Sequence, residues 1–144
     1  MKPASTIYTL GTSTRSMDEF LQLLAAYEIS IVVDVRRFPM SRFEHFQRQN
    51  LERALTQAGI TYVYAGSELG GYRTGGYEDF TGTETFLNGI ERVEALARQG
   101  RVAIMCAERF PWRCHRRFIG DALAERGWNM VHIIETGKHW TPHR

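Results

Sequence analysis

The sequence predicts an α/β fold in which a single three-layer domain is built around a mostly parallel, five-stranded sheet. Short runs of apolar and β-branched residues alternate along the chain with apolar stripes of helical spacing, which gives five strands and four helices. Strands that alternate with helices pair in parallel through right-handed crossovers, so that helices cover both faces of the sheet. A length of 144 residues suits one domain, and we expect residues 1–144 to fold as a unit.

The first strand is expected at residues 7–10, which combine β-branched, aromatic and aliphatic side chains. Ser16 and Glu19 then have the spacing of a capping box, which predicts the start of a helix that continues to about residue 27. Residues 29–35 are almost wholly apolar and rich in valine and isoleucine. This composition is typical of a central strand that is covered on both faces.

The second helix is indicated by apolar residues at helical spacing between positions 51 and 58, and Gly59 is a favourable residue for its end. A third strand is expected at residues 60–64. The apolar stripe of the third helix lies between residues 86 and 96, and this helix should end near Gly100. Both of these helices therefore end at a glycine that leads into the next strand.

The fourth strand is expected at residues 102–106, which are wholly apolar. A fourth helix carries its apolar residues at positions 118–123 and should end near Gly127, and residues 130–134 form the last strand. The resulting order of alternating strands and helices predicts a Rossmann-like or rhodanese-like arrangement.

Residues 66–82 interrupt this regular spacing, because they contain six glycines. We expect them to form a loop rather than a strand or a helix, either a functional lid or a disordered insertion. Tyr72, Tyr77 and Phe80 favour the lid, because disordered linkers are poor in aromatic residues. The tail at residues 137–144 is expected to fray.

The composition excludes several classes of protein. A hydrophobic content of 43% and a charged content of 24% are those of a globular domain, and two cysteines are too few for a disulfide framework. The apolar runs fall far short of the roughly 20 residues that span a bilayer, so no membrane association is predicted. The N-terminal residues lack the apolar core of a signal peptide, and a cytoplasmic location is the expectation.

Basic and nucleophilic side chains collect where the predicted strands end. Ligands of open parallel sheets bind outside the carboxyl ends of the strands, next to the N-termini of the following helices. Arginine accounts for sixteen of the eighteen basic residues. We predict a site for an anion or a phosphate group there, although arginines that cap helices against nearby acids are the alternative explanation. The expected anion-binding residues are Gly11, Ser13, Arg36, Arg37, Arg73, Arg113 and Arg116.

Cys106 is the candidate nucleophile or redox thiol, because it ends a strand and faces the start of a helix. Asp34, Glu108 and His115 are the candidates for acid–base groups. Cys114 is expected inside the following helix and to be the less reactive thiol. A buried, inert Cys106 is the alternative. The two cysteines and His115 could together supply three metal ligands, but no fourth ligand is evident and no metal site is predicted.

The segment around Cys106 resembles the strand, cysteine, loop and helix of rhodaneses and cysteine phosphatases, although Arg113 lies one position later than the phosphatase signature requires. The chain as a whole resembles the Domain of Unknown Function 488 family from about residue 7 to residue 135. The motifs that carry this resemblance are Tyr8-Thr9-Leu10-Gly11-Thr12-Ser13, Asp34-Val35-Arg36-Arg37-Phe38-Pro39-Met40-Ser41-Arg42, Gly59-Ile60-Thr61-Tyr62, Leu69-Gly70-Gly71, Cys106-Ala107-Glu108 and Cys114-His115-Arg116. The resemblance implies a small α/β domain and brings no established activity.

Two functional hypotheses follow from these residues. The first is a cysteine-dependent enzyme that acts on an anionic or phosphate-bearing small molecule and needs no cofactor. The second is a non-catalytic module in which the same arginines bind the phosphates of a nucleotide or nucleic acid and the loop aromatics stack on bases. The sequence is compatible with a homo-oligomer in either case.

Overall fold

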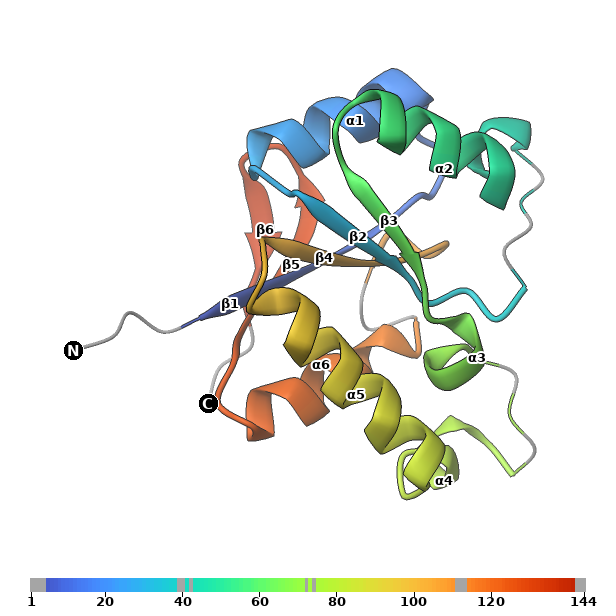
Figure 1. Ribbon diagram of the computed structural model, residues 1–144, viewed down its shortest axis with the longest axis vertical. Helices are drawn as coiled ribbons and strands as arrows, with labels where there is room; N and C mark the ends of the chain where they lie inside the picture. Colours follow the sequence, from blue (N-terminus) through green and yellow to red (C-terminus); the bar gives the residue numbers. More distant parts are fainter. Residues whose placement is uncertain are drawn as a thin grey trace.

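The computed structural model describes residues 5–38, 41, 43–71, 73, 75–110 and 114–141. The strands of these residues form a single sheet in the order β3-β2-β4-β1-β5-β6 (Figure 1). Every neighbouring pair is parallel except β5 and β6, which are antiparallel. The strands are β1 (Thr6–Gly11), β2 (Ile31–Asp34), β3 (Thr61–Tyr64), β4 (Val102–Cys106), β5 (Asn129–Glu135) and β6 (Lys138–Trp140).

Helices cover both faces of the sheet, which confirms the predicted α/β fold with its three layers (Figure 1). One face carries α1 (Met17–Ala26), the 3-10 helix η1 (Glu44–Phe46) and α2 (Arg48–Gln57). The opposite face carries α3 (Gly66–Leu69), α4 (Tyr77–Phe80), α5 (Glu84–Ala97) and α6 (Arg116–Glu125).

The two cores follow from the alternation of side chains along the central strands. Val32 belongs to the same core cluster as Phe20 of α1, whereas its neighbour Val33 belongs to the cluster that contains Phe86 of α5 and Ile119 of α6. Successive strand residues point to opposite faces, so a strand buried on both sides must be apolar throughout. This is the pattern that residues 29–35 and 102–106 have in the sequence.

The capping box at the start of α1 forms as predicted. The Ser16 hydroxyl accepts a hydrogen bond from the Glu19 N–H at 3.1 Å, and the Ser16 N–H donates to the Glu19 carboxylate at 2.9 Å. Two backbone donors at the helix N-terminus are therefore satisfied locally.

The sheet has six strands rather than the five expected, because residues 138–140 pair with β5 instead of fraying. Gly137 adopts a positive φ of 76°, which allows the chain to reverse between the two strands. Trp140 stacks on His132, with 5.3 Å between the ring centroids. This short hairpin covers the edge of β5.

The expectation that residues 66–82 contain no helix is wrong, because α3 and α4 are single helical turns within this segment. Side-chain contacts stabilise both turns. Arg73 donates hydrogen bonds to the carbonyls of Gly70 and Ser67 at 2.8 and 2.6 Å, next to the end of α3. In α4, Tyr77 and Phe80 pack edge-on against Phe86 of α5. The segment is thus anchored to the domain at two points.

Candidate functional site

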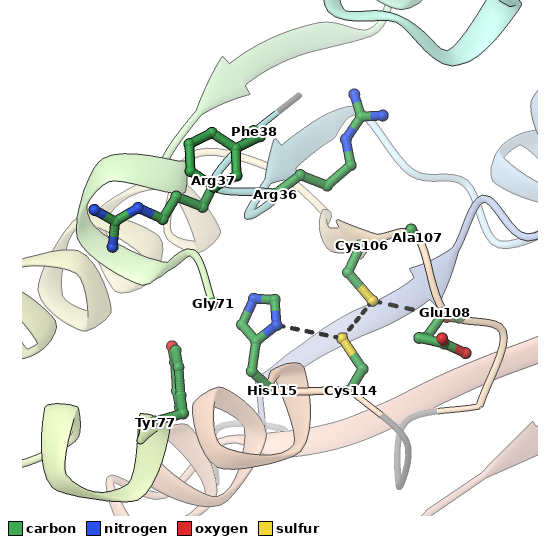
Figure 2. Close-up of a pocket in the computed structure, with 10 residues that line it drawn as sticks. All are labelled: Arg36, Arg37, Phe38, Gly71, Tyr77, Cys106, Ala107, Glu108, Cys114 and His115. Carbon is green, nitrogen blue, oxygen red and sulfur yellow. Dashed lines mark hydrogen bonds between the residues drawn. The ribbon is translucent and has the colours of Figure 1, made fainter. Parts of the chain in front are cut away.

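A cavity of about 380 Å³ opens at the carboxyl edge of the sheet, where the sequence predicts the site (Figure 2). It brings together the end of β4, the start of α6, the residues after β2 and the glycine-rich segment. The lining residues are Arg36, Arg37, Phe38, Gly71, Tyr77, Cys106, Ala107, Glu108, Cys114 and His115.

The loop after Cys106 is fixed against the end of β1. The Thr12 N–H donates to the Cys106 carbonyl and the Ser13 N–H to the Ala107 carbonyl, both at 2.9 Å. Gly11 lies directly under this loop, and a Cβ atom there would overlap the carbonyl of Glu108. Gly11 and the Ser13 amide, which the sequence assigns to anion binding, therefore hold the loop that follows the cysteine.

The two cysteine sulfurs lie next to each other, with 2.7 Å between Cys114 Sγ and Cys106 Sγ (Figure 2). Both are free thiols. The prediction that Cys114 lies inside a helix is wrong, because α6 begins at Arg116. The apolar stripe of this helix starts only at Phe118, so the sequence does not define the residue at which the helix begins.

His115 is oriented by a hydrogen bond between its Nε2 and the Val35 carbonyl, at 3.1 Å. A carbonyl only accepts, so Nε2 carries the proton and Nδ1 of the neutral ring is an acceptor. That Nδ1 lies 3.6 Å from Cys114 Sγ. Tyr77 packs on the ring of His115, with 5.0 Å between centroids, and Gly71 leaves the space that the ring occupies.

The two thiols have opposite electrostatic environments. Cys106 is 2% exposed, and this burial, together with the adjacent Cys114, raises its pKa well above the ordinary value. The adjacent Cys106 thiol, His115 and the Arg116 N–H at the start of α6 lower the pKa of Cys114, against the opposing effect of burial. These environments favour negative charge on Cys114 rather than on Cys106, the thiol for which the sequence predicts the higher reactivity.

Arg116 is a fully buried cation beside the two thiols. Its NH1 donates to the Thr9 hydroxyl at 3.2 Å and its NH2 to the Arg109 carbonyl at 2.7 Å. Within the described part of the chain its Nε has no hydrogen-bond partner, and no carboxylate forms an ion pair with it. Its charge favours the ionised form of Cys106 and so lowers the pKa of that thiol, against the larger effect of burial.

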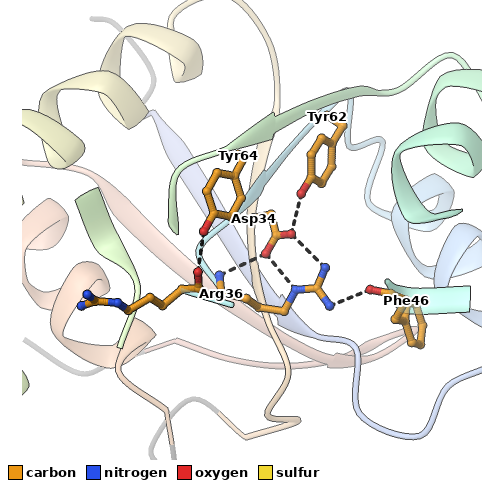
Figure 3. A network of polar contacts seen from close by, with 6 residues as sticks. Asp34, Arg36, Phe46, Tyr62 and Tyr64 are labelled. Atoms are coloured by element: carbon orange, nitrogen blue, oxygen red, sulfur yellow. Dashed lines mark hydrogen bonds and ion pairs between the residues drawn. The ribbon is translucent and has the colours of Figure 1, made fainter. Parts of the chain in front are cut away.

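Asp34 and Arg36 form a buried ion pair beside the cavity that Arg36 helps to line (Figure 3). The Arg36 Nε and NH2 donate to the two carboxylate oxygens at 2.9 Å each, and NH1 donates to the Phe46 carbonyl at 2.7 Å. Tyr62 donates its hydroxyl to Asp34 at 2.6 Å, and burial together with this carboxylate raises the pKa of Tyr62. Asp34, a candidate acid–base group, and Arg36, a candidate anion-binding residue, therefore form their hydrogen bonds within the protein.

The other arginines of the predicted anion site are dispersed. The guanidinium of Arg73 lies on the Phe80 ring, 3.9 Å from its centroid, and bonds the carbonyls after α3. Arg37 lines the cavity, but its guanidinium points away from the sulfurs (Figure 2). Glu108 is exposed at the cavity rim and its carbonyl accepts from Cys106 at 3.7 Å. Arg113 lies outside the described residues.

A family model described as "Domain of unknown function DUF488" matches residues 16–123. The chain belongs to the DUF488 family. The part of this DUF488 domain that the model matches contains Asp34, Arg36, both cysteines and His115. No curated protein and no solved structure matches the chain.

Two negative findings apply to the described ranges of this DUF488 chain. None of the helices there is long and apolar enough to cross a membrane. No group of three or more His, Cys, Asp or Glu side chains in these ranges could hold a metal ion.

Proposed function

We propose that this DUF488 protein is a cysteine-dependent enzyme whose nucleophile is Cys114. The observation that carries the proposal is the set of three groups around Cys114 Sγ at the cavity wall: Cys106 Sγ at 2.7 Å, the Arg116 N–H at 3.5 Å and His115 Nδ1 at 3.6 Å. All three favour negative charge on the sulfur. A cysteine in such surroundings reacts as the thiolate near neutral pH.

His115 supplies the base of this site. Its Nε2–H is held by the Val35 carbonyl, which leaves Nδ1 to take the proton of the Cys114 thiol. The imidazolium that results remains beside the thiolate, and it can return the proton to a leaving group after the nucleophilic attack. Tyr77 packs on the ring and helps to keep this orientation.

The cavity defines the size and the access of the substrate. A volume of about 380 Å³ accommodates a small molecule or one side chain of a larger partner. Cys114 is half-buried and borders the cavity, so a substrate bound there meets its sulfur directly. The predicted binding of an anion by arginines has less support, because the guanidinium groups of Arg36 and Arg73 form hydrogen bonds with other groups of the protein.

The alternative of a nucleic-acid or nucleotide module needs free arginines and aromatic residues for stacking. Tyr77 and Phe80 instead pack against Phe86, and Tyr77 also packs against His115. Of the arginines, Arg36, Arg73 and Arg116 bond to protein groups. No contact among the described residues favours that alternative over thiol chemistry.

The pH dependence of alkylation tests the proposal. We expect iodoacetamide to label Cys114 with a midpoint well below the usual thiol pKa of about 8.5, and to label Cys106 much more slowly. Cleavage after Glu108 places the two thiols on separate peptides, so mass spectrometry reads each rate independently. In His115→Gln the midpoint of Cys114 should rise. Faster labelling of Cys106 than of Cys114 in the native protein would contradict the assignment.

A further inference from the structure

We propose that the substrates of this site are disulfides, and that Cys106 acts as the resolving thiol that closes a reversible Cys106–Cys114 bond. This inference rests on the proposed role of Cys114 as the attacking thiolate and adds the substrate class and a second reacting group. The observation behind it is the direct contact of the two sulfurs, which are eight residues apart in sequence and 2.7 Å apart in space (Figure 2).

The positions of the two thiols suit them to different steps of the exchange. Cys114 is partly exposed and borders the cavity, so it can meet an external disulfide. Cys106 is 2% exposed and ends β4, which is hydrogen-bonded to β2 on one side and β1 on the other. A thiol that is buried and fixed by two strands is poorly placed to attack an external partner but well placed to attack a neighbouring sulfur.

The exchange balances in two steps. The Cys114 thiolate attacks one sulfur of the substrate disulfide, a mixed disulfide forms, and the first substrate thiol leaves with the proton held on His115 Nδ1. Cys106 Sγ then attacks Cys114 Sγ, the Cys106–Cys114 bond forms, and the second substrate thiol leaves with the Cys106 proton. The substrate is reduced by two electrons and the protein is oxidised by two. A small-molecule thiol of the glutathione class restores the dithiol for the next turnover.

The buried Arg116 gives a physical reason for the second step. Its charge favours the ionised form of Cys106, the form that must attack Cys114, and so opposes the larger effect of burial on this thiol. Within the described residues no carboxylate forms an ion pair with this guanidinium, so its charge can stabilise the negative charge that develops on Cys106 as this sulfur attacks. In the reduced pair, the Arg116 N–H and the Cys106 thiol stabilise the Cys114 thiolate. Closing the disulfide removes that anion. The reduced form is therefore the stabilised one, and the disulfide should be strongly oxidising.

Oxidised glutathione is the probe that tests the inference, with mass spectrometry of the intact protein and of its peptides as the readout. We expect the native protein to lose the mass of two hydrogens, to release two equivalents of glutathione and to gain a Cys106–Cys114 linkage. Cys106→Ser removes the resolving thiol but keeps a hydrogen-bond donor beside Cys114. This variant should stop at a stable glutathionyl adduct on Cys114, and Cys114→Ser should form neither product.

The outcomes separate this inference from the proposed function. A stable glutathionyl adduct on Cys114 in the native protein, with no intramolecular bond, overturns the resolving role of Cys106 and leaves Cys114 as a nucleophile. Failure of Cys114 to react with either glutathione or iodoacetamide in the folded protein overturns both. A linkage that forms equally fast in His115→Gln would contradict the proton transfer through His115.

Discussion

Two polar clusters lie at the same edge of the sheet and differ in whether their charges are satisfied. At the ends of β2 and β3, the charges of Asp34 and Arg36 neutralise each other and Tyr62 completes the bonding of the carboxylate. At the end of β4 and the start of α6, no carboxylate of the described residues forms an ion pair with Arg116, which lies beside two thiols.

The difference indicates which cluster holds the fold together and which is available for reaction. Burying a charge is tolerated when hydrogen bonds and an opposite charge compensate it, and the Asp34–Arg36 pair meets both conditions. In the cysteine cluster, the Arg116 Nε has no hydrogen-bond partner among the described residues, and the pKa values of the two thiols are shifted in opposite directions. Unsatisfied, strongly perturbed groups beside a cavity are typical of functional sites.

The largest expected effect is the loss of stability in Asp34→Ala. Removing one partner of a buried ion pair leaves the other charge uncompensated, which costs about 3–5 kcal/mol of unfolding free energy. Urea denaturation measures it, with the exposed Asp121→Ala as the matched control. Tyr62→Phe removes only one bond to the carboxylate and should cost roughly 1–2 kcal/mol. If Asp34→Ala were no more destabilising than Asp121→Ala, Asp34 would return as an acid–base candidate.

The next effect is a pH dependence that originates in His132. Its Nδ1 lies 2.6 Å from the Thr9 hydroxyl, which accepts from Arg116 and so donates its own hydrogen to His132. Burial, and secondly Arg116, lower the pKa of His132 to about 4. The unfolded chain binds a proton below about pH 6.5 and the folded one only near pH 4, so stability falls as the pH falls through this window.

The size of this loss is about 3 kcal/mol between neutral pH and pH 4. In His132→Asn, the amide oxygen can still accept from Thr9 but does not titrate. Urea unfolding of both proteins across the window should show the difference, because acid-sensitive carboxylates are common to the two. Parallel curves for the variant and the native protein would mean that His132 does not remain neutral in the fold.

Most of the fold could be predicted because its signals are local. The capping box at Ser16 and the apolar runs of the central strands depend only on neighbouring residues. Strand β6 was missed because a three-residue exposed strand has no pattern of buried residues. The turn before it is marked in the sequence only by Gly137, whose positive φ became known from the structure. Helices α3 and α4 were missed because their stability comes from Arg73 and from aromatic contacts to α5.

The position of the cavity at the carboxyl edge could also be predicted, but the contacts among its side chains could not. The carboxyl ends of parallel strands meet at one edge, which brought Cys106 and His115 together as expected. The ion pair of Arg36 had a local signal, since Asp34 precedes it by two residues and points to the same side. The partners of Arg116 are Thr9 and the Arg109 carbonyl, and the tertiary structure alone brings Thr9 to it.

The third effect concerns the hydrogen bond between the thiols. Cys106→Ser keeps a donor next to the Cys114 thiolate, whereas Cys106→Ala removes it. A hydrogen bond to a charged group contributes about 1.5–3 kcal/mol, so the alkylation midpoint of Cys114 should lie at least about one pH unit higher in the alanine variant. Absorbance of the thiolate at different pH values gives an independent measurement. Equal midpoints in the two variants would show that Cys106 does not stabilise the thiolate.

The smallest expected effect comes from Gly71→Ala, which tests how the glycine-rich segment supports the reactive cluster. A Cβ atom at this position would lie 3.3 Å from His115 Nδ1, so the ring must shift by a few tenths of an ångström. The shift weakens the contact between Nδ1 and Cys114 Sγ, while the Asp34–Arg36 pair is not touched. Alkylation of Cys114 should slow by roughly threefold, which corresponds to less than about 1 kcal/mol.

Gly82→Ala is the matched control for this change. Its Cβ would meet only the Asp79 carbonyl at 3.6 Å, an ordinary contact, and should leave the labelling rate of Cys114 unchanged. Urea denaturation should give nearly equal stabilities for both variants, so that a slower reaction in Gly71→Ala reports on the position of His115. If both variants label at the native rate, the orientation of His115 depends on its bond to the Val35 carbonyl and on Tyr77, and Gly71 only provides space at the cavity wall.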